Sequence, residues 1–554
     1  MLSEILSIKL FDKFSWLSSW LTHSFKNPIV LVITILTLWL LVDYFVTSPS
    51  EIPGIFSIPG CLPIVGNLHQ VMNNPALVYL KWVEQYKHSI FQIRLGNKRI
   101  IVVNSFEDIV SLWIRHSCPN NSRPVSYTFH GIVSAIQGFT VGSTPASLTY
   151  KRKKKAISQH LNKRAVGDIS NVIDLEIKYL FTAIIKNNEL FYYTDMIDVD
   201  LMPFFQMFAL RSSIFLAYGI HLDCYGRDRE ACLEIIEVEN KIIQLRSPIS
   251  NLQDSIWLLR YIPFLNIAAS SYAERRNIYM KKLYECLLRG IEQNDDDCIN
   301  SIIGDLVFKQ SSSVSALAES EIQSICLTYV SAGLDNTPLN LNYLIGILSQ
   351  PQLGARLQDV AINEIIEKSN GNLVLAWEQS GQDSMDVQYV QALVLETLRH
   401  FTVLPLSLPR VTSKAITHNN IVIPPGSNLF MNAYAGNHDP GHFSLPYEFV
   451  PERWIDPDSG LVTQGINHHF AFGAGSRMCS GYNLAFKELY MITCRILLLF
   501  EIGPPIEGPL MGLDPFENNS NPRATSFEPK PHHVGFRLRH LPNCNGLYQK
   551  IFTG

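Results

Sequence analysis

The chain has 554 residues, of which 47% are hydrophobic and 17% charged, and this is the composition of an ordinary globular protein with a large core. Its formal net charge of −4 argues against a nucleic-acid-binding protein, which needs a broad basic surface. The ten cysteines include no C-x-x-C pair, so the sequence indicates neither a zinc ribbon, nor a thioredoxin-type site, nor a dense disulfide framework, and a reducing compartment is expected.

The first residues divide into two parts. Residues 1–27 mix apolar side chains, including Trp16 and Trp20, with polar ones, which fits either a segment lying in a membrane interface or a disordered tail. Residues 28–46 are almost wholly apolar and as long as one membrane crossing, and no small-residue cleavage site follows them. We therefore predict a single transmembrane anchor. Lysines precede this span and acidic residues follow it, which by charge alone places the N-terminus in the cytosol.

Residues 47–67 contain four prolines, and prolines stiffen a linker, so this stretch is predicted to be a hinge. The next stretch, 90–103, alternates apolar and polar residues around Gly96-Asn97, which predicts a pair of strands joined by a tight turn. From about 169 to 348 the apolar spacing is mostly helical.

Two features lie between the strands and the helices. A Gly- and Ser-containing loop, 123–145, carries aromatic and polar side chains: Tyr127, Phe129, His130, Gln137 and Phe139. A basic run, 151–155, follows the loop, and its simplest interpretation is a solvated helix face.

Residues 321–348 are predicted to form one long helix. Within it, the stretch 331–338 combines small residues with Asp335, Asn336, Thr337 and Pro338. Pro338 removes a helix hydrogen bond and favours a kink. An acid beside a hydroxyl can relay protons.

An E-x-x-R pair, Glu396 and Arg399, lies on a later predicted helix, where residues three apart share one face. The P-E-R-W segment 451–454 then supplies Arg453. A buried Glu between two arginines is costly unless all three are bonded, so these residues are predicted to be structural.

Near the end, residues 472–481 read F-x-x-G-x-R-x-C-x-G, followed by an apolar run with helical spacing. The positive end of a helix dipole favours a thiolate at Cys479, and a thiolate is a metal ligand. Gly475 and Gly481 permit close approach of the backbone, and Arg477 is a cation suited to a carboxylate.

This loop resembles the haem-binding loop of the cytochromes P450, the haem-thiolate monooxygenases. The order of the helix kink, E-x-x-R, P-E-R-W and the cysteine loop matches that family over nearly all of the chain after residue 67. The resemblance implies a mainly α fold with a small β region, with one haem-thiolate catalytic domain over 68–554. It also implies haem with Cys479 as its axial ligand. The residues implied to hold the haem are Phe472, Gly475, Arg477, Gly481 and Arg410.

The resemblance further implies that Asp335, Asn336 and Thr337 deliver protons to bound dioxygen. Two departures stand out. Asn336 occupies the position where the family carries a hydroxyl, and Thr337 comes one residue later. No tryptophan lies between Gly142 and Arg152, where the family often has one to reach a haem propionate.

Within the family, segments such as 128–131, 137–140 and 473–480 resemble the fungal phenylacetate hydroxylase group. This implies hydroxylation of a small phenolic or aryl-methyl compound, in secondary metabolite biosynthesis or aromatic catabolism. The implied partners are an NADPH-dependent flavoprotein reductase, dioxygen, the substrate and membrane lipid, with no nucleic acid. The implied location is the endoplasmic reticulum membrane, single-pass with a cytosolic catalytic domain, which is opposite to the orientation from charge.

Three alternatives stay open. One is a monooxygenase of a non-aromatic polyketide or terpenoid. Another is a reductase-independent haem-thiolate isomerase or dehydratase, which stays open because Asn336 replaces the hydroxyl that the family carries. The last is a silent haem- or small-molecule-binding protein.

Overall fold

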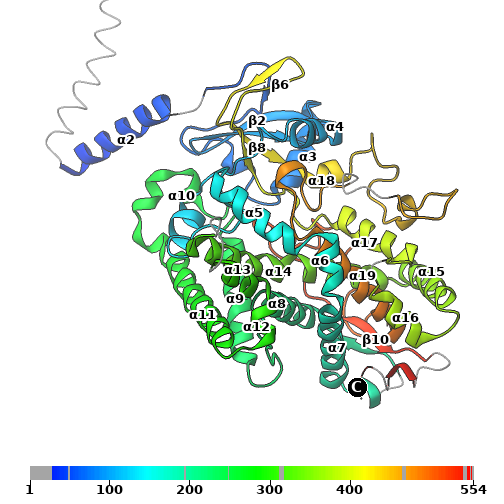
Figure 1. Cartoon of the computed structure of the whole chain (residues 1–554). Coiled ribbons are helices and arrows are strands. Elements are labelled where there is room, and N and C mark those ends of the chain that lie inside the picture. The colour runs from blue at the N-terminus through cyan, green and yellow to red at the C-terminus, as the bar shows by residue number, and fades with distance from the viewer. Residues whose placement is uncertain are drawn as a thin grey trace, which may run out of the picture.

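The computed structural model describes residues 28–47, 50–192, 195–247, 249–310, 317–382, 384–463, 469–540, 546–548 and 551. A large helical body carries a smaller sheet region at one end (Figure 1). The predicted mainly α fold with a small β region is therefore confirmed. The interfacial or disordered segment predicted for 1–27 lies outside the described residues.

The helices follow the predicted spacing. Their bounds are α2 (Pro28–Thr47), α3 (Pro75–Tyr86), α4 (Phe106–Ile109), α5 (Leu148–His160), α6 (Lys163–Asp168), α7 (Ser170–Asn187), α8 (Met202–Tyr218), α9 (Arg229–Gln244), α10 (Leu252–Ser255), α11 (Ile267–Glu292), α12 (Asp296–Asn300), α13 (Ile302–Gln310), α14 (Glu319–Leu348), α15 (Leu353–Lys368), α16 (Leu373–Ser380), α17 (Gln388–Phe401), α18 (Ala433–Asn437) and α19 (Tyr482–Leu499). Short helical turns important for the site are η2 (Val110–Arg115), η3 (Tyr127–Val133), η5 (Trp257–Tyr261), η7 (Pro451–Trp454) and η9 (Gly475–Arg477).

The strands form three small sheets. Their bounds are β1 (Phe56–Ser57), β2 (Ile90–Leu95), β3 (Lys98–Val103), β4 (Ile197–Val199), β5 (Arg410–Val411), β6 (Ile416–His418), β7 (Ile421–Ile423), β8 (Asn428–Met431), β9 (Phe500–Gly503) and β10 (Val534–Leu538). The sheet orders are β1-β2-β3-β8-β5, β4-β10-β9 and β6-β7. The predicted strand pair is confirmed, because β2 and β3 pair antiparallel with Leu95 opposite Lys98 across the turn. Gly96 has a φ of +59°, and a Cβ there would lie 1.8 Å from the carbonyl oxygen of Ser255, so the turn requires glycine.

Strand β10 lies between β9 and β4, and Asn519 and Pro529 form an isolated bridge shortly before it. Val534 and Phe536 of β10 are buried in the main hydrophobic core together with side chains of β9.

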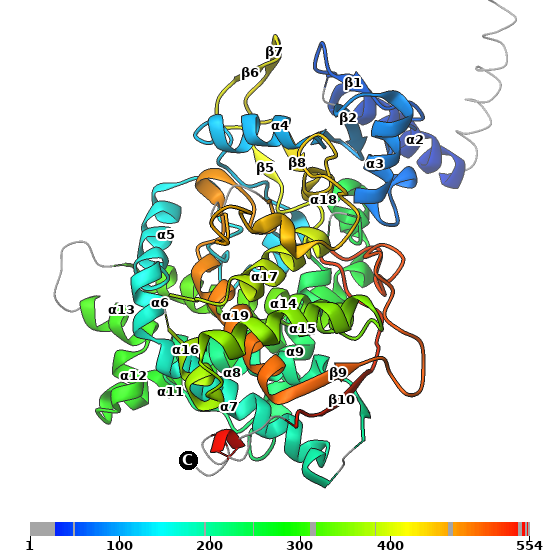
Figure 2. The same cartoon turned by 90° about the vertical axis from the view of Figure 1, so that its right-hand side faces the viewer.

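Helix α14 runs through the middle of the helical body, with α17 and α19 beside it (Figure 2). Its C-terminal half belongs to the main hydrophobic core together with α7, α15, α17 and α19. Its N-terminal half packs in a second core with α8, α9 and α11. The Glu321 carboxylate accepts from the backbone N–H of Ala318 at 2.9 Å, which caps the first turn. Pro338 lies inside the helix, as predicted.

Helix α2 forms where the apolar span was predicted, and it projects from the sheet end of the molecule (Figure 1). Eight of its large apolar side chains are between 44% and 69% exposed: Ile29, Val32, Ile33, Ile35, Leu36, Leu38, Trp39 and Val42. Over the part of the chain that the structure describes, however, no helix has the length and apolar character that a membrane crossing requires. The transmembrane assignment of 28–46 is therefore not supported.

The proline-containing segment after α2 packs on the sheet. The side chain of Gln92, on β2, accepts from the backbone N–H of Ile52 at 3.0 Å and donates to the carbonyls of Ile52 and Ile55 at 3.0 and 2.8 Å. Ile52 and Ile55 are buried, and β1 continues the sheet. The stretch predicted as a hinge thus has part of its length fixed to the body.

Candidate functional site

Cys479 lies between η9 and α19, three residues before the first turn of that helix. Its backbone N–H donates to the carbonyl of Phe472 at 3.0 Å, which closes the loop, and the Phe472 ring meets the edge of Tyr482 at 4.9 Å. The Cys479 residue is exposed to solvent, but the protein atoms around its sulfur desolvate the thiol and raise its pKa, while a hydrogen bond from the backbone of Gly481 and the charge of Lys154 lower it. Both opposing groups favour the thiolate.

Gly475 fixes where this loop sits. Its φ is +64°, and a Cβ would lie 1.9 Å from the carbonyl oxygen of Trp113 on η2. The next N–H, that of Ser476, donates to the hydroxyl of Ser117 at 2.6 Å. Gly475 is therefore required by close packing against η2. From the sequence alone, the need for glycine at this position was attributed to the bound group.

The basic run on α5 is only partly a solvated face, because Lys151 and Lys155 are exposed whereas Lys153 is buried. Lys153 is only 4% exposed and donates to the hydroxyls of Thr144 and Ser324 at 2.8 and 2.7 Å. Burial lowers its pKa to about 8, and the charge of Glu321 opposes that shift. Lys154 donates to the carbonyl of Ser476 in the cysteine loop. The run therefore ties α5 to α14 and to the loop.

Three buried arginines gather beside the loop. The side chain of Arg410 donates to the carbonyls of Asn120 and Ala474, and Arg123 donates to the carbonyls of Leu408 and Pro409. Burial and the charge of Arg477 lower the pKa of Arg410 to about 9. Burial also lowers the pKa of Arg123, well below its usual range, with repulsion from the other two arginines adding to the effect.

This cluster fits an anionic group that carries more than one carboxylate. Nε and Nη1 of Arg477 are buried and have no hydrogen-bond partner among the residues that the structure describes, and the same is true of Nε1 of Trp113, whose ring lies 5.8 Å from the Arg410 guanidinium. None of the described carboxylates forms an ion pair with Arg123, Arg410 or Arg477. Unpartnered buried donors are costly, so two propionates of a haem would satisfy this donor set.

The described residues contain no cluster of three or more His, Cys, Asp or Glu side chains that could hold a metal ion alone. Cys479, the arginines and the glycine of η9 together fit haem, as the resemblance implied.

The three residues predicted to move protons share one stretch of α14. The Asp335 carboxylate accepts from the hydroxyl of Ser526 at 2.9 Å, and burial raises the pKa of Asp335. Oδ1 of Asn336 is buried without a partner, so it is an open acceptor for a water molecule. Thr337 is buried.

A Cβ on Gly333 would lie 2.0 Å from Oγ of Ser213, so this glycine permits the close contact between α14 and α8.

The aromatic loop 123–145 divides between two environments. Phe129 and His130 are buried, with their rings 5.1 Å apart. Burial lowers the pKa of His130, and its Nδ1 accepts from the backbone N–H of Ser126 at 3.0 Å, so the neutral ring carries its proton on Nε2. Tyr127 instead accepts from Asn266, and Gln137 donates to Asn277 of α11.

Glu396 lies at the centre of a fully bonded network. Arg399 binds it through Nε and Nη2 at 2.9 and 2.7 Å, and Arg453 binds it at 3.2 Å. The indole N–H of Trp454 donates to it at 2.9 Å. Glu396 and Arg399 are completely buried. The structure thus brings the three predicted residues together, and the bonding partners of each are other groups of the protein.

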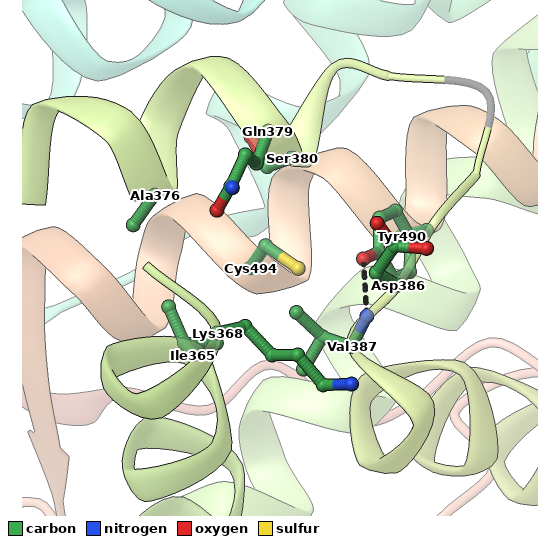
Figure 3. Close-up of a pocket in the computed structure, with 9 residues that line it drawn as sticks. All are labelled: Ile365, Lys368, Ala376, Gln379, Ser380, Asp386, Val387, Tyr490 and Cys494. Atoms are coloured by element: carbon green, nitrogen blue, oxygen red, sulfur yellow. Dashed lines mark hydrogen bonds between the residues drawn. The ribbon is translucent and has the colours of Figure 1, made fainter. Parts of the chain in front are cut away.

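One described cavity lies elsewhere. It has a volume of about 50 Å³ and is bounded by α15, α16, α19 and the start of α17, with the backbone N–H of Val387 donating to the Tyr490 hydroxyl at 3.1 Å (Figure 3). Cys494, which lines it, is twelve residues into α19, roughly 18 Å from the first turn. The cavity is therefore separate from the Cys479 loop.

Sequence reasoning did not identify Arg123 and Trp113 as parts of the site. An isolated arginine before a proline carries no signal of its own. Only their burial beside the cysteine loop distinguishes them.

Comparison with known proteins agrees with this geometry. The cytochrome P450 family model matches residues 57–526. Phenylacetate 2-hydroxylase of Emericella nidulans is 38% identical over 92% of this chain and 95% of its own length. The 3-hydroxyphenylacetate 6-hydroxylase of the same organism is 35% identical over 90% and 92%, and cytochrome P450 monooxygenase CYP3 of Mycosarcoma maydis is 33% identical over 90% and 89%.

Members of this family bind haem through a cysteine thiolate and receive electrons from NADPH through a reductase. The motif order, the helical fold and the donor set around Cys479 lead to the same conclusion as the comparisons. The chain belongs to the cytochrome P450 family and is an oxygen-incorporating oxidoreductase.

Proposed function

We propose that this P450 hydroxylates a small aromatic compound carrying a phenolic or aryl-methyl group, in secondary metabolite biosynthesis or aromatic catabolism. The observation that carries this is the similarity, over nine-tenths of the chain, to two enzymes named for hydroxylating phenylacetate and 3-hydroxyphenylacetate. The buried Phe129 ring supports it, because an aromatic side chain can stack on a substrate ring.

Cys479 is proposed as the axial ligand, with Phe472, Gly475, Gly481 and Arg477 forming the loop around it. Arg410, joined by Arg123, would bind the propionates, since these arginines have no carboxylate partner among the described residues. Bound haem supplies the activation of dioxygen that inserts one oxygen atom into the substrate.

Asp335 and Asn336 are proposed to handle protons. Burial raises the pKa of Asp335, which favours its protonated form relative to an exposed carboxyl, and Ser526 donates to that carboxyl and would orient it. Asn336 would hold a water through its open Oδ1, and Thr337 lies one residue further along the helix. Asn cannot itself relay a proton well, so in this proposal the water carries it.

The test is binding followed by product analysis. The haem-loaded protein is titrated with cresols, hydroxybenzyl alcohols and phenylacetates, and a low-spin to high-spin shift of the Soret band is expected. Turnover with NADPH, reductase and isotopically labelled dioxygen should place one labelled oxygen in the product. A saturable shift and turnover only with a terpenoid or aliphatic polyketide would refute the aromatic assignment.

A second function is favoured by one observation. Asn336 stands where a relay hydroxyl is expected, and a reductase-independent isomerase or dehydratase has no need of that hydroxyl. Such an enzyme would convert its substrate without NADPH, and omission of NADPH from the assay separates the two functions.

We also propose that the segment ending in α2 attaches the protein to the endoplasmic reticulum membrane, with the catalytic domain in the cytosol. The exposed apolar side chains of α2 support attachment, because they would gain by burial in lipid. A cytosolic catalytic domain would face the reductase.

A further inference from the structure

Arg246 is a partly buried cation that the proposed mechanism does not use. It follows the last turn of α9, in the connection leading to α10. Its Nε and Nη2 are buried and have no hydrogen-bond partner among the described residues. A buried guanidinium with open N–H groups costs free energy unless something binds it.

The surroundings of Arg246 are those of the proposed reaction site. Its guanidinium lies over the face of the Phe129 ring, 4.6 Å from the centroid. Its charge acts on the neighbouring His130 and on Asp335 of α14. Burial lowers the pKa of Arg246 to about 10, so the side chain is still a cation at neutral pH.

The two acids near Arg246 are bonded to other groups. Glu239 accepts from the hydroxyls of Tyr279 and Ser331, the latter at 2.7 Å. Asp335 accepts from Ser526. Neither forms an ion pair with Arg246 within the described part of the chain.

A second buried arginine increases the positive charge. Arg276 of α11 is fully buried, and it acts on Arg246 by repulsion. Its Nη2 donates to the carbonyl of Val133 at 2.9 Å, while Nε and Nη1 have no partner among the described residues. Two guanidinium groups with open N–H donors therefore lie in this region of the structure.

The open edge of Arg246 is the one that binds carboxylates elsewhere in this protein. Arg399 binds Glu396 through Nε and Nη2, and Arg275 binds Glu234 through the same two atoms. These N–H groups are parallel and match the two oxygens of a carboxylate. In Arg246, Nε and Nη2 are the two atoms left without a partner.

We infer that the Nε–Nη2 edge of Arg246 binds the carboxylate of the substrate, and that the substrate is an aromatic acid whose ring lies against Phe129. This rests on the proposed function and narrows it from small aromatic compounds to those that carry an acid group. Arg246 is thereby a specificity-determining residue, and a neutral analogue would leave its two N–H groups unpaired.

The test compares acids with their amides. Haem-loaded wild-type protein is titrated with benzoate, phenylacetate and 3-phenylpropionate and with the corresponding amides, by Soret shift and by calorimetry. A charge-assisted pair contributes about 1.5–3 kcal/mol, so at least one acid should bind roughly 10- to 150-fold more tightly than its amide. Equal binding of every acid and its amide would overturn the inference.

Variants assign the effect to Arg246. Arg246→Gln should lose the preference for the acid while its affinity for the amide stays unchanged. Arg246→Lys keeps the charge without the paired N–H edge, and should retain only part of the preference. The matched control is Arg260→Gln, because Arg260 also lies over an aromatic ring, that of Tyr127, but already donates to the carbonyl of Gln253. An acid preference that persists in Arg246→Gln would refute the assignment, whether or not Arg246→Lys folds.

The outcomes separate this inference from the proposed function. Aliphatic acids that bind in an Arg246-dependent manner, while no aromatic compound binds, would retain the carboxylate site and refute the aromatic substrate. Cresols that bind and turn over with no preference for acids would retain the proposed function and refute the carboxylate site.

Discussion

Desolvation by the surrounding protein raises the pKa of the Cys479 thiol, and the backbone of Gly481 and the charge of Lys154 lower it. Because iron binds the thiolate, the loop must release this proton when haem is incorporated. We expect Cys479→Ala to abolish the red-shifted Soret band of the reduced carbon monoxide complex. Cys494→Ala is the control, since that buried cysteine lies well along α19, and it should keep the band. A thiolate-type band in Cys479→Ala would show that another residue is the ligand.

Asn336 has an open buried Oδ1, which we propose holds a water. Asn336→Ala removes that acceptor, so NADPH oxidation should become uncoupled from product, with more peroxide released. Thr337→Ala, one residue along the same helix, provides the comparison. Unchanged coupling in Asn336→Ala together with loss of coupling in Thr337→Ala would move the role to the hydroxyl.

Glu488 on α19 is a buried acid whose pKa burial raises from 4.5 to about 7. Between these two values the unfolded chain loses this proton and the folded protein keeps it, so stability falls as pH rises through that range. The shift corresponds to roughly 3 kcal/mol. Glu488→Gln, which still accepts from Ser212, should therefore lose less thermal stability than wild type between pH 5 and pH 8. Equal losses in both proteins would contradict the shift.

At the scale of elements, the contact between α17 and η7 depends on Glu396. Its removal leaves Arg399 buried and uncompensated, which costs about 3–5 kcal/mol. Glu396→Ala should give little haem-loaded protein. Glu452→Gln breaks the neighbouring pair with Arg356, whose side chains are 42% and 50% exposed, and should cost at most about 1 kcal/mol. Well-folded Glu396→Ala holoprotein with only slow turnover would mean that Glu396 acts in the reaction.

The crossing of α8 and α14 depends on Gly333, where an added Cβ would lie 2.0 Å from Oγ of Ser213. Gly333→Ala should lower the unfolding temperature, because the Ser213 side chain, or the helices with it, must shift to make room for the added methyl group. In a Ser213→Ala background the hydroxyl is absent, so the same change should cost less, with a coupling of about 1 kcal/mol by double-mutant cycle. Additive effects would show that the helices do not meet there as described.

At the scale of the whole molecule, the helical class and the β2–β3 pair were predictable because both depend on local patterns: 3.6-residue spacing, and Gly-Asn between alternating strands. The partners of Glu396 were predictable from the order of motifs. Arg123 and Arg246 were not, since their importance arises from contacts with residues more than a hundred positions away in the sequence. The pairing of β10 with β9 was not predictable either, because it depends on the core that covers these strands.

The proposed membrane attachment concerns the molecule as a whole. Removing residues 1–48 deletes α2 and its exposed apolar side chains, and should release the protein from membranes while haem incorporation continues. Cell fractionation and the carbon monoxide spectrum measure both. A full-length protein found entirely in the soluble fraction would rule out attachment through α2.

The bonds between Gln92 and the segment at Ile52 and Ile55 shorten the connection between α2 and the body. Only residues 48–51 separate the end of α2 from the first fixed residue, a reach of at most about 18 Å. If α2 is held in lipid, this short connection would limit how far the catalytic body can tilt. It would also keep one side of the body turned toward the bilayer. Lengthening this connection with Gly and Ser residues should leave substrate affinity unchanged while broadening the range of orientations that the membrane-bound protein adopts.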